Sequence, residues 1–169
     1  MNHNKFNAGI PKRSTSENSS TRPKLGVPAH VTVLFPFMAP ECVTDAELGT
    51  IHGIAGANAA FEFILAKVGR FPVTTYLAPE PAQPFIRLTL QFAAAFPAYP
   101  PFGGAHAGII PHLKVAHGDM SDADQAEHEL LSLMESLGPI PAVCRSIVLI
   151  ENSSGRWKPM HEFPLMSQK

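Results

Sequence analysis

Two histidines, His30 and His112, stand in matching short apolar runs that read AHVTVLF and PHLKVA and lie 82 residues apart. In each run a hydrogen-bond donor follows two positions later, Thr32 in the first and Lys114 in the second. Histidine titrates near neutrality, with an ordinary pKa of about 6.5. One imidazole can therefore take a proton from an attacking water or hydroxyl while the other protonates the departing oxygen. Donors beside them can hold the oxygens of a phosphoryl group, so the pattern suits metal-free chemistry on a phosphodiester.

Both runs are rich in branched apolar residues and bounded by proline, which is typical of buried strands. Alternate residues of a strand share a face, so His30 should lie beside Thr32 and His112 beside Lys114. A lone histidine on a strand is more often a core or surface residue, but two in equivalent contexts favour a pair that serves one cleft. Lys114 lies among apolar neighbours, and it must either extend outward or face a polar cleft.

The rest of the chain predicts helices and strands that alternate around these two runs. A capping-box pattern, Thr44 to Glu47, opens a first helix, and Phe85, Leu88, Phe92 and Phe96 recur at helical spacing. A third helix should start near Ser121 and stop at Gly138. Further strands are expected over Phe61–Val68, Phe71–Leu77, Pro141–Glu151 and Arg156–Leu165.

Each half thus contains a histidine strand, a helix and two strands, and the short connections favour antiparallel pairing over parallel winding. We predict an α+β fold of two duplicated strand-helix-strand-strand units, with two antiparallel sheets facing a central cleft. Residues 1–24 should be a disordered polar tail, and residues 25–169 a single bilobal domain. Its lobes should cover about 25–83 and 105–169, linked by a helix at about 84–97.

Composition excludes several classes of partner. The net charge is −1 and the pI about 6.7, without the basic surplus of proteins that grip a long DNA duplex. No apolar run has the length of a membrane span, and the N-terminus lacks a secretory core. We expect a cytoplasmic monomer that acts on a small nucleotide or an RNA terminus without a cofactor. Cys42 and Cys144 should be reduced core thiols. The spacing of His106, His112 and His117 fits no strong metal-binding signature.

The runs HVTVLFPF and PHLKVA resemble the paired His-x-Thr/Ser-x motifs of the two-histidine phosphoesterase superfamily, and the 2′-5′ RNA ligase-like branch is the closer match. The resemblance extends to FPVTTYLAPEP, FPAYPPFGG and the closing GRW and FPL segments. It implies a groove between two sheets and metal-independent action on 2′,3′-cyclic phosphates or 2′-5′ linkages. It also implies that His30 and His112 are the acid/base pair and that Thr32 and Lys114 bind the substrate phosphate. Lys114 stands where the motif has a hydroxyl residue.

That departure leaves two hypotheses open. Lysine can still donate to a phosphoryl oxygen, and hydrolysis is then favoured over ligation because no phosphate-cradling glycine loop with lysine is present. Alternatively, the chain is a non-catalytic module that binds nucleotides or RNA ends, in which Lys114 strengthens binding at the expense of turnover. In either case Phe102 and Trp157 are candidates for stacking on a base. The remaining alternative is a housekeeping α+β domain in which the two matching histidines occur by coincidence and share no function.

Overall fold

The computed structural model describes residues 4–9, 29–105 and 108–167 of the chain. Within these residues, eight antiparallel strands form one continuous sheet in the order β6-β3-β4-β5-β2-β1-β7-β8. The strands are β1 (Asn4–Gly9), β2 (His30–Phe37), β3 (Phe61–Phe71), β4 (Thr74–Glu80), β5 (Leu113–His117), β6 (Ile140–Cys144), β7 (Ser146–Glu151) and β8 (Lys158–Pro164).

The sheet has two four-stranded halves that meet where β5 lies against β2. In the part of the chain that the structure describes, this junction is registered through one residue pair, Val31 opposite Leu113. The predicted α+β class with antiparallel strands is confirmed, and the two expected sheets are these two halves.

The halves of the sheet do not coincide with the halves of the chain. Strands β3 and β4 pair with β6 and β5, whereas β2 pairs with β1, and β1 in turn with β7. The predicted lobes over 25–83 and 105–169 are therefore wrong as groupings of strands. Hydrophobic periodicity identifies strands, but it does not say which distant edge each strand joins.

The predicted disordered tail is also corrected in part. Residues Asn4–Gly9 form β1, whose backbone pairs with β2 on one side and with β7 on the other. Backbone hydrogen bonds of this kind do not require an apolar sequence, which explains why composition did not reveal the strand. The remainder of the predicted tail, 1–3 and 10–24, lies outside the described residues.

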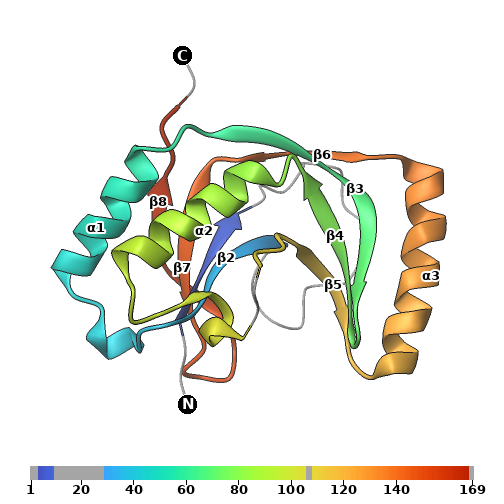
Figure 1. The fold of residues 1–169 in the computed structure, drawn as a ribbon, viewed down its shortest axis with the longest axis horizontal. Helices are drawn as coiled ribbons and strands as arrows, with labels where there is room; N and C mark the ends of the chain where they lie inside the picture. The colour runs from blue at the N-terminus through green and yellow to red at the C-terminus, as the bar shows by residue number, and fades with distance from the viewer. Residues whose placement is uncertain (1–3, 10–28, 106–107, 168–169) are drawn as a thin grey trace.

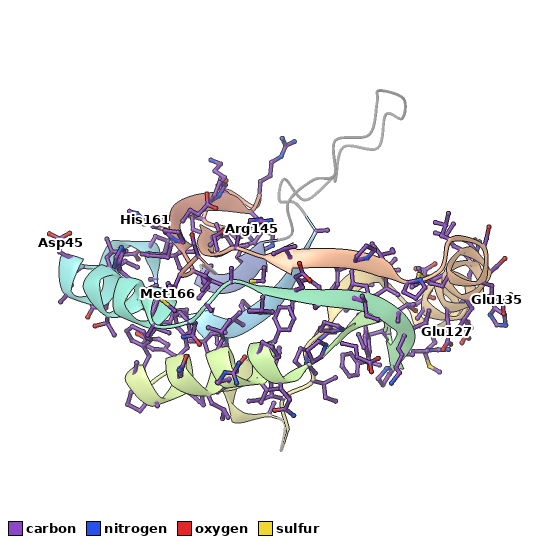
Figure 2. All side chains as sticks on the ribbon, turned by 90° about the horizontal axis from the view of Figure 1, so that it is seen from above. Asp45, Glu127, Glu135, Arg145, His161 and Met166 are labelled. Carbon is purple, nitrogen blue, oxygen red and sulfur yellow. The ribbon has the colours of Figure 1, made fainter. Side chains whose placement is uncertain are left out.

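The described part of the chain has three helices that pack against the sheet, two toward one of its ends and one toward the other (Figure 1). The helices are α1 (Asp45–Gly56), α2 (Gln83–Ala95) and α3 (Met120–Leu137), with short 3₁₀ turns η1 (Pro40–Cys42) and η2 (Pro101–Gly104). Helices α1 and α2 contact each other and pack on β8 and β2, whereas α3 packs on β3, β4 and β5. In Figure 2, Asp45 of α1 lies at the opposite end of the molecule from Glu127 and Glu135 of α3.

Helix α2 supports the strand that carries the first histidine. It buries Phe85, Leu88 and Phe92, as its helical spacing predicts. The hydroxyl of Thr89 on the same helix donates to the carbonyl of Val33 in β2 at 2.9 Å. The helix thus fixes the core side of β2, and the histidine lies on the other side of the strand.

Helix α1 begins with the predicted capping box. The Thr44 side chain accepts from the backbone N–H of Ala46, and the Glu47 carboxylate accepts from the Thr44 backbone N–H and hydroxyl. These hydrogen bonds hold the pKa of Glu47 below its usual value. Its contribution to stability is present above the unfolded-state pKa and is lost as the pH falls through the lowered folded-state pKa.

We expect Thr44→Ala to cost about 1 kcal/mol of unfolding free energy, because it leaves N-terminal amides of α1 without their acceptor. In a thermal melt this corresponds to a Tm lowered by about 2–4 °C. Thr50→Ala, in the interior of the same helix, is the matched control and should keep or raise the Tm, since alanine is the better helix former. An unchanged Tm for Thr44→Ala would contradict the role of the cap.

Candidate functional site

Strands β2 and β5 bury one face in the core and leave the other face more open to solvent. Val31 and Leu113 lie opposite each other, at 0% and 9% exposure, and so define the core face. Because side chains alternate along a strand, the residues that flank this pair point to the other face. That open face is where the sequence predicts the functional residues.

The four predicted site residues flank the buried pair. Continuing the register by one residue each way sets His30 opposite Lys114 and Thr32 opposite His112. His30, Thr32 and His112 are half-buried, and Lys114 is exposed. The two histidines occupy a diagonal of this block, for which the usual separation of the residues is roughly 7–8 Å, with the Cβ atoms somewhat closer. The fold therefore brings together residues that are far apart in the chain, while their chemical roles stay predictions.

A hydrogen bond to the chain and the rings of neighbouring aromatic side chains hold the ring of His112. Its Nδ1 lies 2.8 Å from the carbonyl oxygen of Ile110. A carbonyl can only accept, so Nδ1 carries a hydrogen, and in the neutral ring Nε2 is then the nitrogen that can accept a proton. The rings of Phe71, Tyr76 and Phe102 have centroids 5.1, 5.3 and 6.5 Å from the imidazole. The orientation of His112 is thus set before any ligand arrives.

A pocket of about 500 Å³ adjoins His112 and Lys114. It is lined by Phe71, Pro72, Thr74, Phe102, Gly108, Ile110, His112 and Lys114. His30 and Thr32 do not line it, so the pocket extends from the second motif toward the β3–β4 hairpin. Phe102, a candidate from the sequence, lies at this pocket. Trp157 instead packs edge-on against Phe35, with centroids 6.4 Å apart.

A bulge in β5 decides which face of the strand carries His117. The ladder pairs Tyr76 with Lys114 and Thr75 with Ala116, so one extra residue, at 115, is accommodated as a bulge. A bulge reverses the alternation beyond it, and His117 returns to the face of Lys114. Periodicity alone predicts the opposite face because it assumes an unbroken strand.

Tyr76 and Gly69 form a close contact behind His112. Gly69 lies opposite Tyr76 in the β3–β4 ladder. A Cβ added at Gly69 would lie 2.7 Å from the Tyr76 hydroxyl and closer still to two carbons of its ring. The Tyr76 ring, in turn, packs against Phe71 and His112. The absence of a side chain at Gly69 therefore allows the tyrosine to support the histidine.

We expect Gly69→Ala to cost about 1–3 kcal/mol of unfolding free energy through overpacking. Because the displaced Tyr76 ring supports His112, any catalytic activity that depends on His112 should fall as well. A thermal melt and steady-state kinetics on the same sample measure both effects. Gly53→Ala is the control, since a Cβ at this position in α1 would meet nothing within 4 Å. If Gly69→Ala kept the wild-type Tm and kcat/KM, the support of His112 by Tyr76 would be refuted.

The predicted core thiols are confirmed at one position and corrected at the other. Cys144 is fully buried, and burial raises the pKa of its thiol to about 12. Cys42 is exposed in η1, where no strand or helix covers it. Both thiols are free.

The described residues contain neither a cluster of side chains that could hold a metal ion nor a helix that could span a membrane. No group of three histidine, cysteine, aspartate or glutamate side chains there is arranged to hold a metal ion. His106, part of the spacing considered from the sequence, lies outside those residues. No helix in the described segments combines the length and apolarity that crossing a membrane requires.

Comparison with solved structures shows the fold. The crystal structure of TT0787 of Thermus thermophilus matches with a TM-score of 0.63 and 16% identity, over 99% of this chain and all of the other. E. coli LigT complexed with 3′-AMP matches with a TM-score of 0.61 and 14% identity, over 96% and 97% of the two chains. E. coli LigT complexed with NADP+ gives 0.57 and 16%, with 97% of each chain covered. None of the curated protein sequences is significantly similar to this chain.

A family model identifies the family to which the chain belongs, which similarity of fold alone does not. The model of the 2′-5′ RNA ligase superfamily matches residues 13–156, which include both histidine motifs and most of the chain. This match agrees with the two histidine runs and with their placement on neighbouring strands. The chain belongs to the 2′-5′ RNA ligase superfamily, within the two-histidine phosphoesterases that its motifs resemble.

Proposed function

We propose that this protein is a metal-independent phosphoesterase that acts on a cyclic phosphodiester or a 2′-5′ linkage of RNA ends or small nucleotides. Family membership supports phosphoesterase or ligase-like chemistry in general. The observation that supports the more specific proposal, acid/base catalysis by two histidines, is the pairing of β2 with β5, whose register puts His30 and His112 on the same open face. Two imidazoles that face one phosphate can act as acid and base in the same step.

The proposed reaction is the opening of a 2′,3′-cyclic phosphate. One imidazole takes a proton from water while the water oxygen bonds to phosphorus. The bond from phosphorus to the 2′ or the 3′ oxygen breaks, and the other, protonated imidazole gives its proton to that oxygen. The product is a phosphomonoester, and the two histidines have exchanged protonation states, which bulk water restores.

Thr32 and Lys114 complete the proposed site. Each lies directly across the strand pair from one histidine, so a phosphate held between the imidazoles would meet a hydroxyl and an ammonium group. Negative charge on the non-bridging oxygens increases as the water attacks, and donors aimed at these oxygens favour the transition state. Lys114 supplies a full charge where the family motif supplies a hydroxyl.

A nucleotide is the class of ligand that we propose for the adjoining pocket. The related LigT structures contain 3′-AMP and NADP+, which are both nucleotides. The pocket beside His112 has two phenylalanines, Phe71 and Phe102, whose rings could stack on a base. Its volume of about 500 Å³ lies within the range of small-ligand sites.

The direct test incubates the purified protein with adenosine 2′,3′-cyclic phosphate in the presence of EDTA and follows ring opening. Turnover that persists in EDTA supports the proposal. Turnover abolished by EDTA would refute metal independence. Binding of the nucleotide without turnover would favour the alternative, a binding module in which Lys114 has replaced the hydroxyl.

A further inference from the structure

A polar pair that neither histidine motif includes adjoins the pocket, and one of its members, Thr74, lines it. The Oγ1 of Thr74 lies 2.7 Å from Nδ1 of His117. Thr74 is 6% exposed and lines the pocket together with Lys114, whereas His117 is exposed and reaches the pocket only through its hydrogen bond to Thr74. The bulge at residue 115 is what turns His117 to this face, so the pair exists because the strand departs from regular alternation.

This pair offers a hydrogen-bond donor to a ligand in either of its neutral arrangements. If the Thr74 hydroxyl donates to Nδ1, then Nε2 of His117 carries the ring hydrogen. If Nδ1 donates to Thr74, then the threonine hydroxyl hydrogen is available to the pocket. A protonated His117 ring would donate from both nitrogens. The Thr74–His117 pair therefore keeps a hydrogen to donate to a neighbouring anion, whichever tautomer of His117 is present.

The acidic groups that follow His117 in the sequence, at the start of α3, are engaged elsewhere. Asp119 and Asp122 exchange hydrogen bonds with each other's backbone amides as the cap of α3. Asp124 and Glu127 pair with Arg70 of the β3–β4 hairpin. Among the described residues, none of these carboxylates forms an ion pair with Lys114 or His117.

We propose that Thr74, His117 and Lys114 form a second phosphate-binding subsite beside the reacting phosphodiester. Same-face residues two apart on a strand are separated by about 6.6 Å, so Thr74 lies one such step beyond the row of His30 and Lys114. The inference rests on the proposed function for the position of the first phosphate. It narrows the ligand class to nucleotides that carry an additional phosphate.

The test compares the Kd of adenosine 3′-monophosphate with that of adenosine 3′,5′-bisphosphate by calorimetry. Wild-type protein should bind the bisphosphate about tenfold more tightly or better, as expected for charge-assisted hydrogen bonds. Thr74→Val and His117→Ala should each remove most of this preference, and Thr74→Ser, which keeps the hydroxyl, should retain it. His128→Ala is the matched control, because the ring of this exposed histidine bonds to the Asp124 carbonyl within its own helix, α3.

Equal binding of the two nucleotides by wild-type protein would overturn the subsite, as would a preference that survives in both Thr74→Val and His117→Ala. His117 is exposed, so its variant tests the subsite even if Thr74→Val fails to fold. The readout is binding and not turnover. If the protein prefers the bisphosphate but opens no cyclic phosphate, the proposed function is refuted and the subsite stands. If it opens the cyclic phosphate but binds both nucleotides equally, the subsite is refuted and the proposed function stands.

Discussion

Alanine at His30 or at His112 should lower kcat/KM for adenosine 2′,3′-cyclic phosphate by about 10²–10⁴-fold, the usual contribution of a general acid or base. Both histidines act in one proposed step, so the double variant should lose little more than the worse single variant. His112→Asn gives a sharper test than alanine. Its amide can still donate to the Ile110 carbonyl in place of Nδ1, but it has no counterpart of the titrating Nε2.

The controls separate chemistry from folding and from binding. His52→Ala and His128→Ala remove exposed histidines from α1 and α3 and should leave both the Tm and kcat/KM unchanged. His112→Asn should keep the wild-type Tm. If His30→Ala or His112→Ala kept wild-type activity on the cyclic phosphate, the acid/base assignment would be wrong, and the site would have to act through other residues.

Local signals in the sequence predicted the parts of the fold that depend on short-range physics. The capping box at Thr44 and the helical spacing of Phe85, Leu88 and Phe92 each correspond to an observed helix. These signals hold because a cap and an amphipathic stripe are decided within a few turns of the chain. The repeated motif also predicted that both histidine strands contribute to one cleft, and in the structure these strands lie side by side, β2 against β5.

The parts that the sequence missed depend on distant partners. Strand β1 exists because β2 and β7 offer edges to it, and the grouping of β3 and β4 with β5 depends on which edge is closest in space. Two features of the candidate site also depend on residues that are distant in the sequence or on irregular strand pairing. His117 shares a face with Lys114 only because of a bulge, and Tyr76 supports His112 only because Gly69 lies opposite it. No spacing rule within one segment contains that information.

Replacing Lys114 with methionine should lower kcat/KM for the cyclic phosphate by about a hundredfold, the scale seen when one donor to a developing oxyanion is lost. Methionine keeps an unbranched stem but has no charge and no donor. Kd for 3′-AMP, measured alongside, should rise as well, because the ammonium also attracts the phosphate before it reacts.

Lys114→Thr restores the hydroxyl of the family motif and separates the two hypotheses that the lysine raises. If Lys114 serves the reaction, threonine should recover part of what methionine loses, and the order of kcat/KM should be lysine, threonine, methionine. If the lysine instead holds nucleotides at the expense of turnover, Lys114→Thr should exceed the wild-type rate and bind 3′-AMP more weakly. The first order is the one we expect, because Lys114 is exposed and lies opposite His30 in the register set by Val31 and Leu113, so its charge would be available to a phosphate bound beside His30.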